Sequence, residues 1–133
     1  ITAYHIQAAI AACHTTAETD ADTDWPYILE QYDQLLALTN SPVVELNRAV
    51  AVARVHGPEA GIRELEHLHS DPLLRRYYLL PAVLAGLWYE AGRLAEAAHW
   101  YARALALPCN TAEHRFMEAR AAACRAQLRQ DTA

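Results

Sequence analysis

The fold is decided by residues 84–108, which read LAGLWYEAGRLAEAAHWYARALALP. The segment predicts two helices joined by a short turn at Gly92, and Pro108 stops the second helix. Small side chains stand where two antiparallel helices must approach closely, and large aromatic ones stand where space between helix pairs needs filling. The small residues are Ala85, Ala97 and Ala104, and the aromatic ones are Trp88 and Tyr101.

The same helix–turn–helix pattern recurs upstream. A shift of 35 residues places Gly92 on Gly57, and beyond that turn a shift of 36 places Ala97 on Gly61. A further copy at a shift of 69 places Tyr101 on Tyr32. A period of about 34 to 36 residues is typical of stacked helical repeats. We therefore expect three helical hairpins, at about residues 3–42, 43–72 and 73–108.

Helix boundaries follow from capping residues, glycines and prolines. The expected helices span residues 3–14, 26–38, 43–55, 58–67, 73–91, 94–107 and 112–129. Asp24 can cap a helix that has Pro26 in its first turn, and Asn110 followed by Glu113 resembles a capping box. The last helix has no partner and carries charges on its outward positions, so it resembles the cap that a helical solenoid needs. The sequence thus predicts an all-α fold, with one domain over residues 1–133.

Composition supports helices and narrows the class of protein. Ala supplies 28 of the 133 residues and Leu 17, which favours helix over strand. No apolar run approaches the roughly 20 residues of a membrane span. The three cysteines, Cys13, Cys109 and Cys124, show no CxxC spacing and are interpreted as reduced thiols of a cytoplasmic protein. Because the chain starts with Ile1 and shows no signal-peptide pattern, we expect a fragment of a longer protein.

Charge is distributed unevenly along the chain. Residues 1–45 hold seven acids and no base, whereas the remainder holds nine acids and all 11 arginines. An acidic first third would repel a phosphate backbone, so we expect no direct binding to nucleic acid.

The repeat resembles the tetratricopeptide repeat, a helix–turn–helix unit stacked into a right-handed superhelix. A second resemblance is more specific and rests on residues 4–14 (YHIQAAIAACH), 22–32 (DTDWPYILEQY) and 41–53 (SPVVELNRAVAVA), followed by VHGPEAG at 55–61. These segments look like the C-terminal extension of bacterial extracytoplasmic-function (ECF) sigma factors. The sigma domains that read promoters and bind polymerase are not in this sequence.

The resemblance implies a regulatory and protein-interaction module that modulates transcription initiation. The partners it implies are the sigma domains of the same chain, RNA polymerase or a regulatory protein, with no membrane. Two alternatives remain: a peptide-binding adaptor, or a small-molecule sensor domain of another bacterial signalling protein. An adaptor should show an open groove, and a sensor should show a closed pocket of a few hundred Å³.

The candidate binding site is the concave groove that stacked repeats form with the first helix of each pair. The tetratricopeptide template assigns to it Tyr4, Gln7, Ala11, His14, Val44, Asn47, Ala51, Arg54, Leu79, Ala82, Gly86 and Tyr89. Amide, imidazole, guanidinium and phenol groups on one wall suit a peptide backbone or a carboxylate. The polar candidates are Gln7, His14, Asn47, Arg48, Arg54 and Tyr89. The alternative is that Asn47 and Arg48 make intramolecular bonds to neighbouring helix ends.

Other chemistry finds little support in the sequence. Asp20, Asp22 and Asp24 alternate as in a calcium loop, but Trp25 stands where a glycine is needed and Gln31 replaces the closing glutamate. Cys109 and His114 have no second pair to complete a zinc site. No glycine-rich phosphate loop or nucleophile–base arrangement is present in the sequence. We expect no enzyme activity, no metal and no cofactor.

Overall fold

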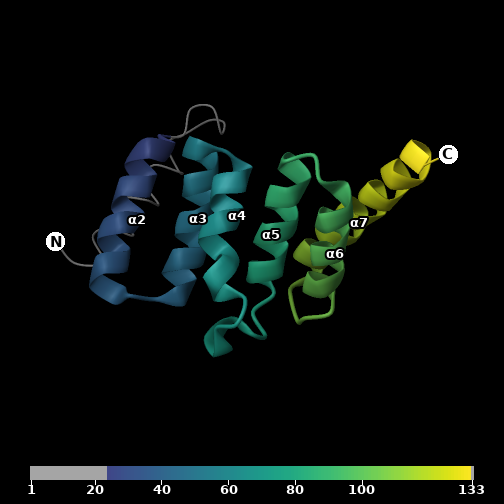
Figure 1. Cartoon of the computed structure of the whole chain (residues 1–133). Helices are drawn as coiled ribbons and strands as arrows, with labels where there is room; N and C mark the ends of the chain where they lie inside the picture. The colour runs from purple at the N-terminus through teal and green to yellow at the C-terminus, as the bar shows by residue number, and fades with distance from the viewer. Residues whose placement is uncertain (1–23, 133) are drawn as a thin grey trace.

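The computed structural model describes residues 24–132, and within that range the chain is all-α with no strand. Its six α-helices follow one another in sequence order (Figure 1). They are α2 (Trp25–Thr39), α3 (Pro42–His56), α4 (Pro58–Leu65), α5 (Leu79–Glu90), α6 (Leu94–Leu105) and α7 (Thr111–Thr132). Two 3-10 turns, Glu66–Leu68 and Pro72–Leu74, connect α4 to α5. The all-α prediction is confirmed for this range, and the helix expected at 3–14 lies outside it.

The helix starts and turns follow the capping residues that the sequence indicated. The Asp24 carboxylate accepts a hydrogen bond from the Tyr27 amide at 3.1 Å, with Pro26 in the first turn. The Asn110 side chain accepts one from the Glu113 amide at 2.8 Å. Gly57 and Gly92 both have positive φ, 101° and 79°, which only glycine adopts without strain. Equivalent turns therefore sit at the same place in α3–α4 and α5–α6.

The fifth helix is shorter than the sequence analysis predicted. A continuous helix was expected over 73–91, but α5 begins only at Leu79. Pro81 lies in its first turn, where a missing amide hydrogen is tolerated, whereas deeper in a helix its ring would collide with the carbonyl four residues earlier. The chain before α5 instead turns through hydrogen bonds three residues apart, from Leu74 to Asp71 and from Tyr77 to Leu74, each 3.1 Å. This leaves Arg75 and Arg76 on an irregular connection.

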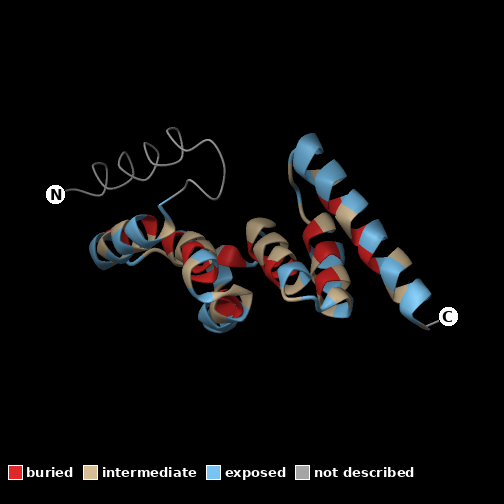
Figure 2. Ribbon diagram, turned by 90° about the horizontal axis from the view of Figure 1, so that it is seen from above, coloured by how far each residue is buried: buried red, intermediate tan, exposed pale blue. Residues whose placement is uncertain are grey.

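Each helix packs chiefly against its neighbours along the chain, and the buried residues face those neighbours (Figure 2). One core cluster joins α3, α4 and α5, and another joins α5, α6 and α7. In the second cluster α7 contributes Met117, Ala121 and Cys124, spaced so that they share one face of the helix. The opposite side of α7 is exposed.

Small residues mark the close helix crossings, as the repeat pattern predicted. Gly61 is buried, and a Cβ added there would lie 2.8 Å from the Ala49 carbonyl oxygen and 2.8 Å from the Ala53 Cβ. Its counterpart Ala97 is fully buried, as is Ala104. Backbones at these positions are too close for larger side chains.

Candidate functional site

An ion pair connects α3 directly to α5, although α4 lies between these two helices in the sequence. A single Arg54 guanidinium nitrogen lies 2.8 and 2.9 Å from the two carboxylate oxygens of Glu90. The same guanidinium lies over the Trp25 ring of α2, with its carbon 6.0 Å from the ring centroid. Arg54 therefore contacts two other helices, and its charge is already balanced within the chain.

A second contact connects α5 to α7. The Arg120 guanidinium carbon lies 4.2 Å from the centroid of the Tyr89 ring and 4.9 Å from that of Phe116. Cation–π contacts at such exposed sites stabilise by roughly 0.5–1 kcal/mol. Tyr89 and Phe116 remain 37% and 52% exposed, so both rings also face solvent.

Arg48 is a structural residue in the described part of the chain. Its guanidinium forms ion pairs with Asp33 of α2 and Glu64 of α4, the latter at 3.1 Å. Burial lowers the pKa of Arg48, but hydrogen bonds and charge attraction from Asp33 and Glu64 outweigh it, so the pKa is raised. Arg48 thus bonds within the chain, as the alternative expected, but its partners are side chains, and Asp33 lies in the middle of α2 rather than at a helix end.

The prediction that Val44 and Ala51 line a concave groove is wrong. Val44 and Ala51 do not line an open wall; they are buried against Ile28 and Leu35 of α2. The tetratricopeptide template does not include the contact with α2, which covers this face of α3. Asn47 is half-buried and lies seven residues before Arg54, so the two residues share one face of α3, beside the face that Val44 and Ala51 occupy.

The structure thus brings only part of the predicted polar set together. Arg54 and Tyr89 lie on contacts that link α3, α5 and α7, and these contacts also engage Glu90 and Arg120. We call the residues Asn47, Arg54, Tyr89, Glu90 and Arg120 the alternate-helix face. Gln7 and His14 fall outside the described residues.

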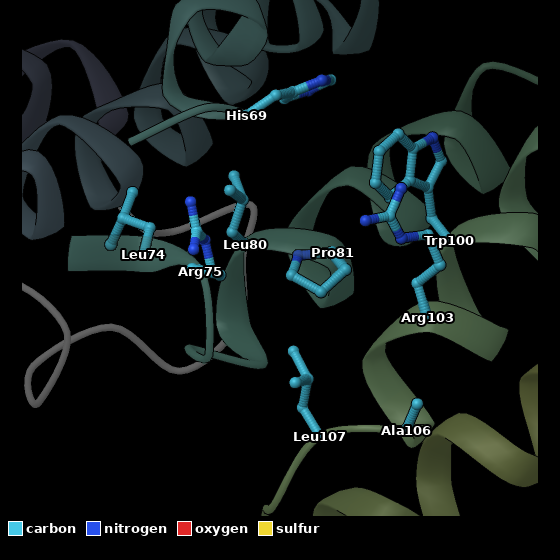
Figure 3. Close-up of a pocket in the computed structure, with 9 residues that line it drawn as sticks. All are labelled: His69, Leu74, Arg75, Leu80, Pro81, Trp100, Arg103, Ala106 and Leu107. Atoms are coloured by element: carbon cyan, nitrogen blue, oxygen red, sulfur yellow. The ribbon is translucent and has the colours of Figure 1, made fainter. Parts of the chain in front are cut away.

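A cleft that the sequence analysis did not anticipate lies between the α4–α5 connection and α6 (Figure 3). Its volume is about 440 Å³. The residues lining this Trp100 cleft are His69, Leu74, Arg75, Leu80, Pro81, Trp100, Arg103, Ala106 and Leu107. The basic residues come from segments about 30 positions apart, and the only sequence signal was the Arg75-Arg76 pair, which has no motif around it.

Aromatic and charged groups meet at one wall of the Trp100 cleft. The Arg103 guanidinium carbon lies 5.1 Å from the Trp100 ring centroid, and the His69 and Trp100 ring centroids are 5.2 Å apart. Burial, together with the positive charge of Arg103, lowers the pKa of His69, while Glu66 opposes this effect. His69 is therefore mostly neutral at pH 7.

Residues 24–132 hold neither a metal-binding cluster nor a membrane-spanning helix. Among residues 24–132, no three His, Cys, Asp or Glu side chains lie close enough to hold a metal ion. No helix in the described part is long and apolar enough to cross a bilayer. Cys109 and Cys124 both carry free thiols, and burial raises the pKa of Cys124.

Comparison with known proteins finds a longer relative. The chain is 43% identical over 114 residues to an uncharacterized protein of Rhizobium meliloti (strain 1021). The match covers 86% of this chain but 26% of that protein, so the chain spans about a quarter of its relative's length. No protein-family model matches the chain, and no solved structure matches it significantly.

Proposed function

We propose that residues 1–133 form a C-terminal regulatory domain of an ECF-type RNA polymerase sigma factor, built as a right-handed tetratricopeptide-like stack. The observation that carries the proposal is a resemblance in sequence to the extensions of such factors, at residues 4–14, 22–32 and 41–53 followed by 55–61, in the same order along the chain. A relative nearly four times longer than the matched segment is consistent with a domain of a larger chain.

The repeat geometry supports the stacked architecture. Hairpins α3–α4 and α5–α6 turn at glycines with positive φ and cross at small residues, Gly61 in one and Ala97 in the other. Because the same contacts recur in both hairpins, they favour a regular rotation from one unit to the next. In this arrangement α2 is the second helix of the first unit and α7 covers the end of the last unit.

The alternate-helix face supports a role in protein contacts. Arg54 pairs with Glu90, and Arg120 lies over Tyr89. Both contacts lie near the surface, where groups of another protein can replace one of the two partners. Arg guanidinium groups and exposed aromatic rings are enriched at binding hot spots. A sigma domain of the parent chain, RNA polymerase or a regulatory protein would contact this face.

Charge in the first third supports a basic partner. Seven acids without a base within residues 1–45 would attract a basic surface and steer its approach. Such docking should weaken as salt rises, because exposed charges are screened within about 10 Å at 0.1 M ionic strength. Docking that does not respond to salt would contradict this electrostatic part of the proposal.

Sequencing the reading frame upstream of the Ile1 codon tests the assignment of the parent. The proposal predicts two sigma domains upstream of this segment. An upstream ATPase or sensor domain, or a start codon at this position, would contradict it and leave only a helical-repeat binding module.

A further inference from the structure

We propose that the Trp100 cleft binds a small organic oxyanion, with a carboxylate or phosphate group held by Arg75 and Arg103 and an apolar body resting on Leu80 and Pro81. This site is separate from the alternate-helix face and does not depend on the sigma-factor assignment. A ligand here would make contacts to both the α4–α5 connection and α6.

The charge of the cleft favours an anion. Arg75 and Arg103 both line it, and no acidic residue of the described chain does. Ion pairs among residues 24–132 engage Arg48, Arg54 and Arg93, and neither cleft arginine takes part in one. Guanidinium groups without a carboxylate partner retain their full capacity for a bidentate bond to an oxyanion.

Arg103 is exposed, and its guanidinium has an aromatic neighbour instead of a counter-ion. Its guanidinium lies against Trp100, while His99 and His69 flank the same indole with ring centroids 5.1 and 5.2 Å away. Cation–π contacts at exposed sites are weak, so what Arg103 offers an anion is its charge beside the indole. Arg75 approaches from the other segment, as Figure 3 shows, so the two cations come from two different walls.

The remaining lining sets the size and polarity of the ligand. Leu74, Leu80 and Pro81 are buried and form an apolar wall, and Leu107 adds to it from beyond α6. A volume of about 440 Å³ lies within the range of small-molecule sites, roughly 300–1,000 Å³. A neutral His69 adds a hydrogen-bonding group but no second charge. The combination suits one anionic group on an apolar body.

The test is calorimetric titration of the chain with four probes: benzoate, phenyl phosphate, inorganic phosphate and benzyl alcohol. We expect benzoate or phenyl phosphate to bind with a millimolar or lower Kd, and benzyl alcohol to bind at least tenfold more weakly, because it lacks the charge. The stronger of the two organic anions identifies the preferred group. If benzyl alcohol binds as tightly as the anions, or if no anion binds at about 10 mM, the proposal is wrong. If inorganic phosphate binds as tightly as phenyl phosphate, the apolar wall contributes nothing and the organic ligand is excluded.

Variants locate the site. Arg103→Gln and Arg75→Gln should each weaken binding of the preferred anion about tenfold or more, since a hydrogen bond to a charged group is lost. Arg125→Gln is the matched control, because Arg125 is exposed in the second half of α7, which does not line the cleft. Amide NMR spectra report folding, and on ligand addition they should shift at His69 and Trp100. Equal binding by the Arg75, Arg103 and Arg125 variants would place the anion elsewhere and overturn the proposal.

Discussion

Arg54 of α3 and Glu90 of α5 are 36 positions apart, yet one guanidinium nitrogen lies within 2.9 Å of both carboxylate oxygens. The two residues are separated by close to one repeat period, so the pair joins equivalent ends of successive first helices. It is the side-chain contact that most directly relates one hairpin to the next.

This pair should contribute modestly to stability. Both side chains are about one-third exposed, and exposed ion pairs typically contribute about 0.2–1 kcal/mol. A double-mutant cycle with Arg54→Gln and Glu90→Gln should therefore give a coupling energy in that range by chemical denaturation, falling as salt is added. A coupling energy of zero at low salt would show that the contact does not form in solution.

Substitution of alanine for glycine should change the free energy of unfolding in opposite directions at two helical glycines. Gly61→Ala would place a methyl group 2.8 Å from the Ala49 carbonyl oxygen, so we expect a loss of about 1–3 kcal/mol in the free energy of unfolding. Gly86 in α5 has no described atom within 4 Å of an added Cβ, and Gly86→Ala should stabilise by about 0.5–1 kcal/mol. Chemical denaturation of both variants measures the free energy of unfolding. A Gly61→Ala variant as stable as the parent would refute the close α3–α4 crossing.

Larger side chains in place of the buried alanines of α6 should destabilise the fold. Ala97 and Ala104 are fully buried against α5 and α7, so Ala97→Leu or Ala104→Leu should overpack the crossing and cost roughly 1–3 kcal/mol. Ala95→Leu is the control, because Ala95 is exposed on the same helix. Thermal melts in which all three variants match the parent would contradict the repeat register.

His69 should titrate below an ordinary histidine, whose pKa is about 6.5. Burial and Arg103 favour its neutral form in the folded state, so its stabilising contribution is present above the unfolded pKa. That contribution is lost as pH falls through the lowered folded pKa. NMR titration of the imidazole should show that the pKa of His69 in the folded protein rises in Arg103→Gln and stays constant in Arg125→Gln. An unchanged value in Arg103→Gln would mean that the Arg103 charge does not reach His69.

Local signals in the sequence predicted the helices well. Asp24 and Asn110 cap the helices they precede, and Gly57 and Gly92 form the turns, because each acts through bonds to residues only a few positions away. The extent of α5 was missed because apolar periodicity continues through 73–91 while Pro81, a single residue, decides where the helix can begin.

The sites were harder to predict, because they depend on contacts between segments. Val44 and Ala51 satisfy the groove spacing, yet α2 covers them, and spacing within α3 carries no information about α2. The Trp100 cleft forms because the irregular chain before α5 places Arg75 on one wall while α6 places Arg103 on another. Intramolecular bonding of Arg48 was the alternative expectation, but its partners Asp33 and Glu64 lie on other helices and cannot be identified from α3 alone.

Run-off transcription by the full-length protein that contains this segment tests the proposed regulatory role most directly. The comparison uses the parent, a chain without residues 1–133, the double variant Asn47→Ala/Arg54→Ala and the control Arg125→Ala. The account predicts that the deletion and the double variant each change transcript yield about fivefold or more, as expected for a coupling of at least 1 kcal/mol, whereas the control does not. Equal transcript yields from all four proteins would contradict a regulatory role for this domain.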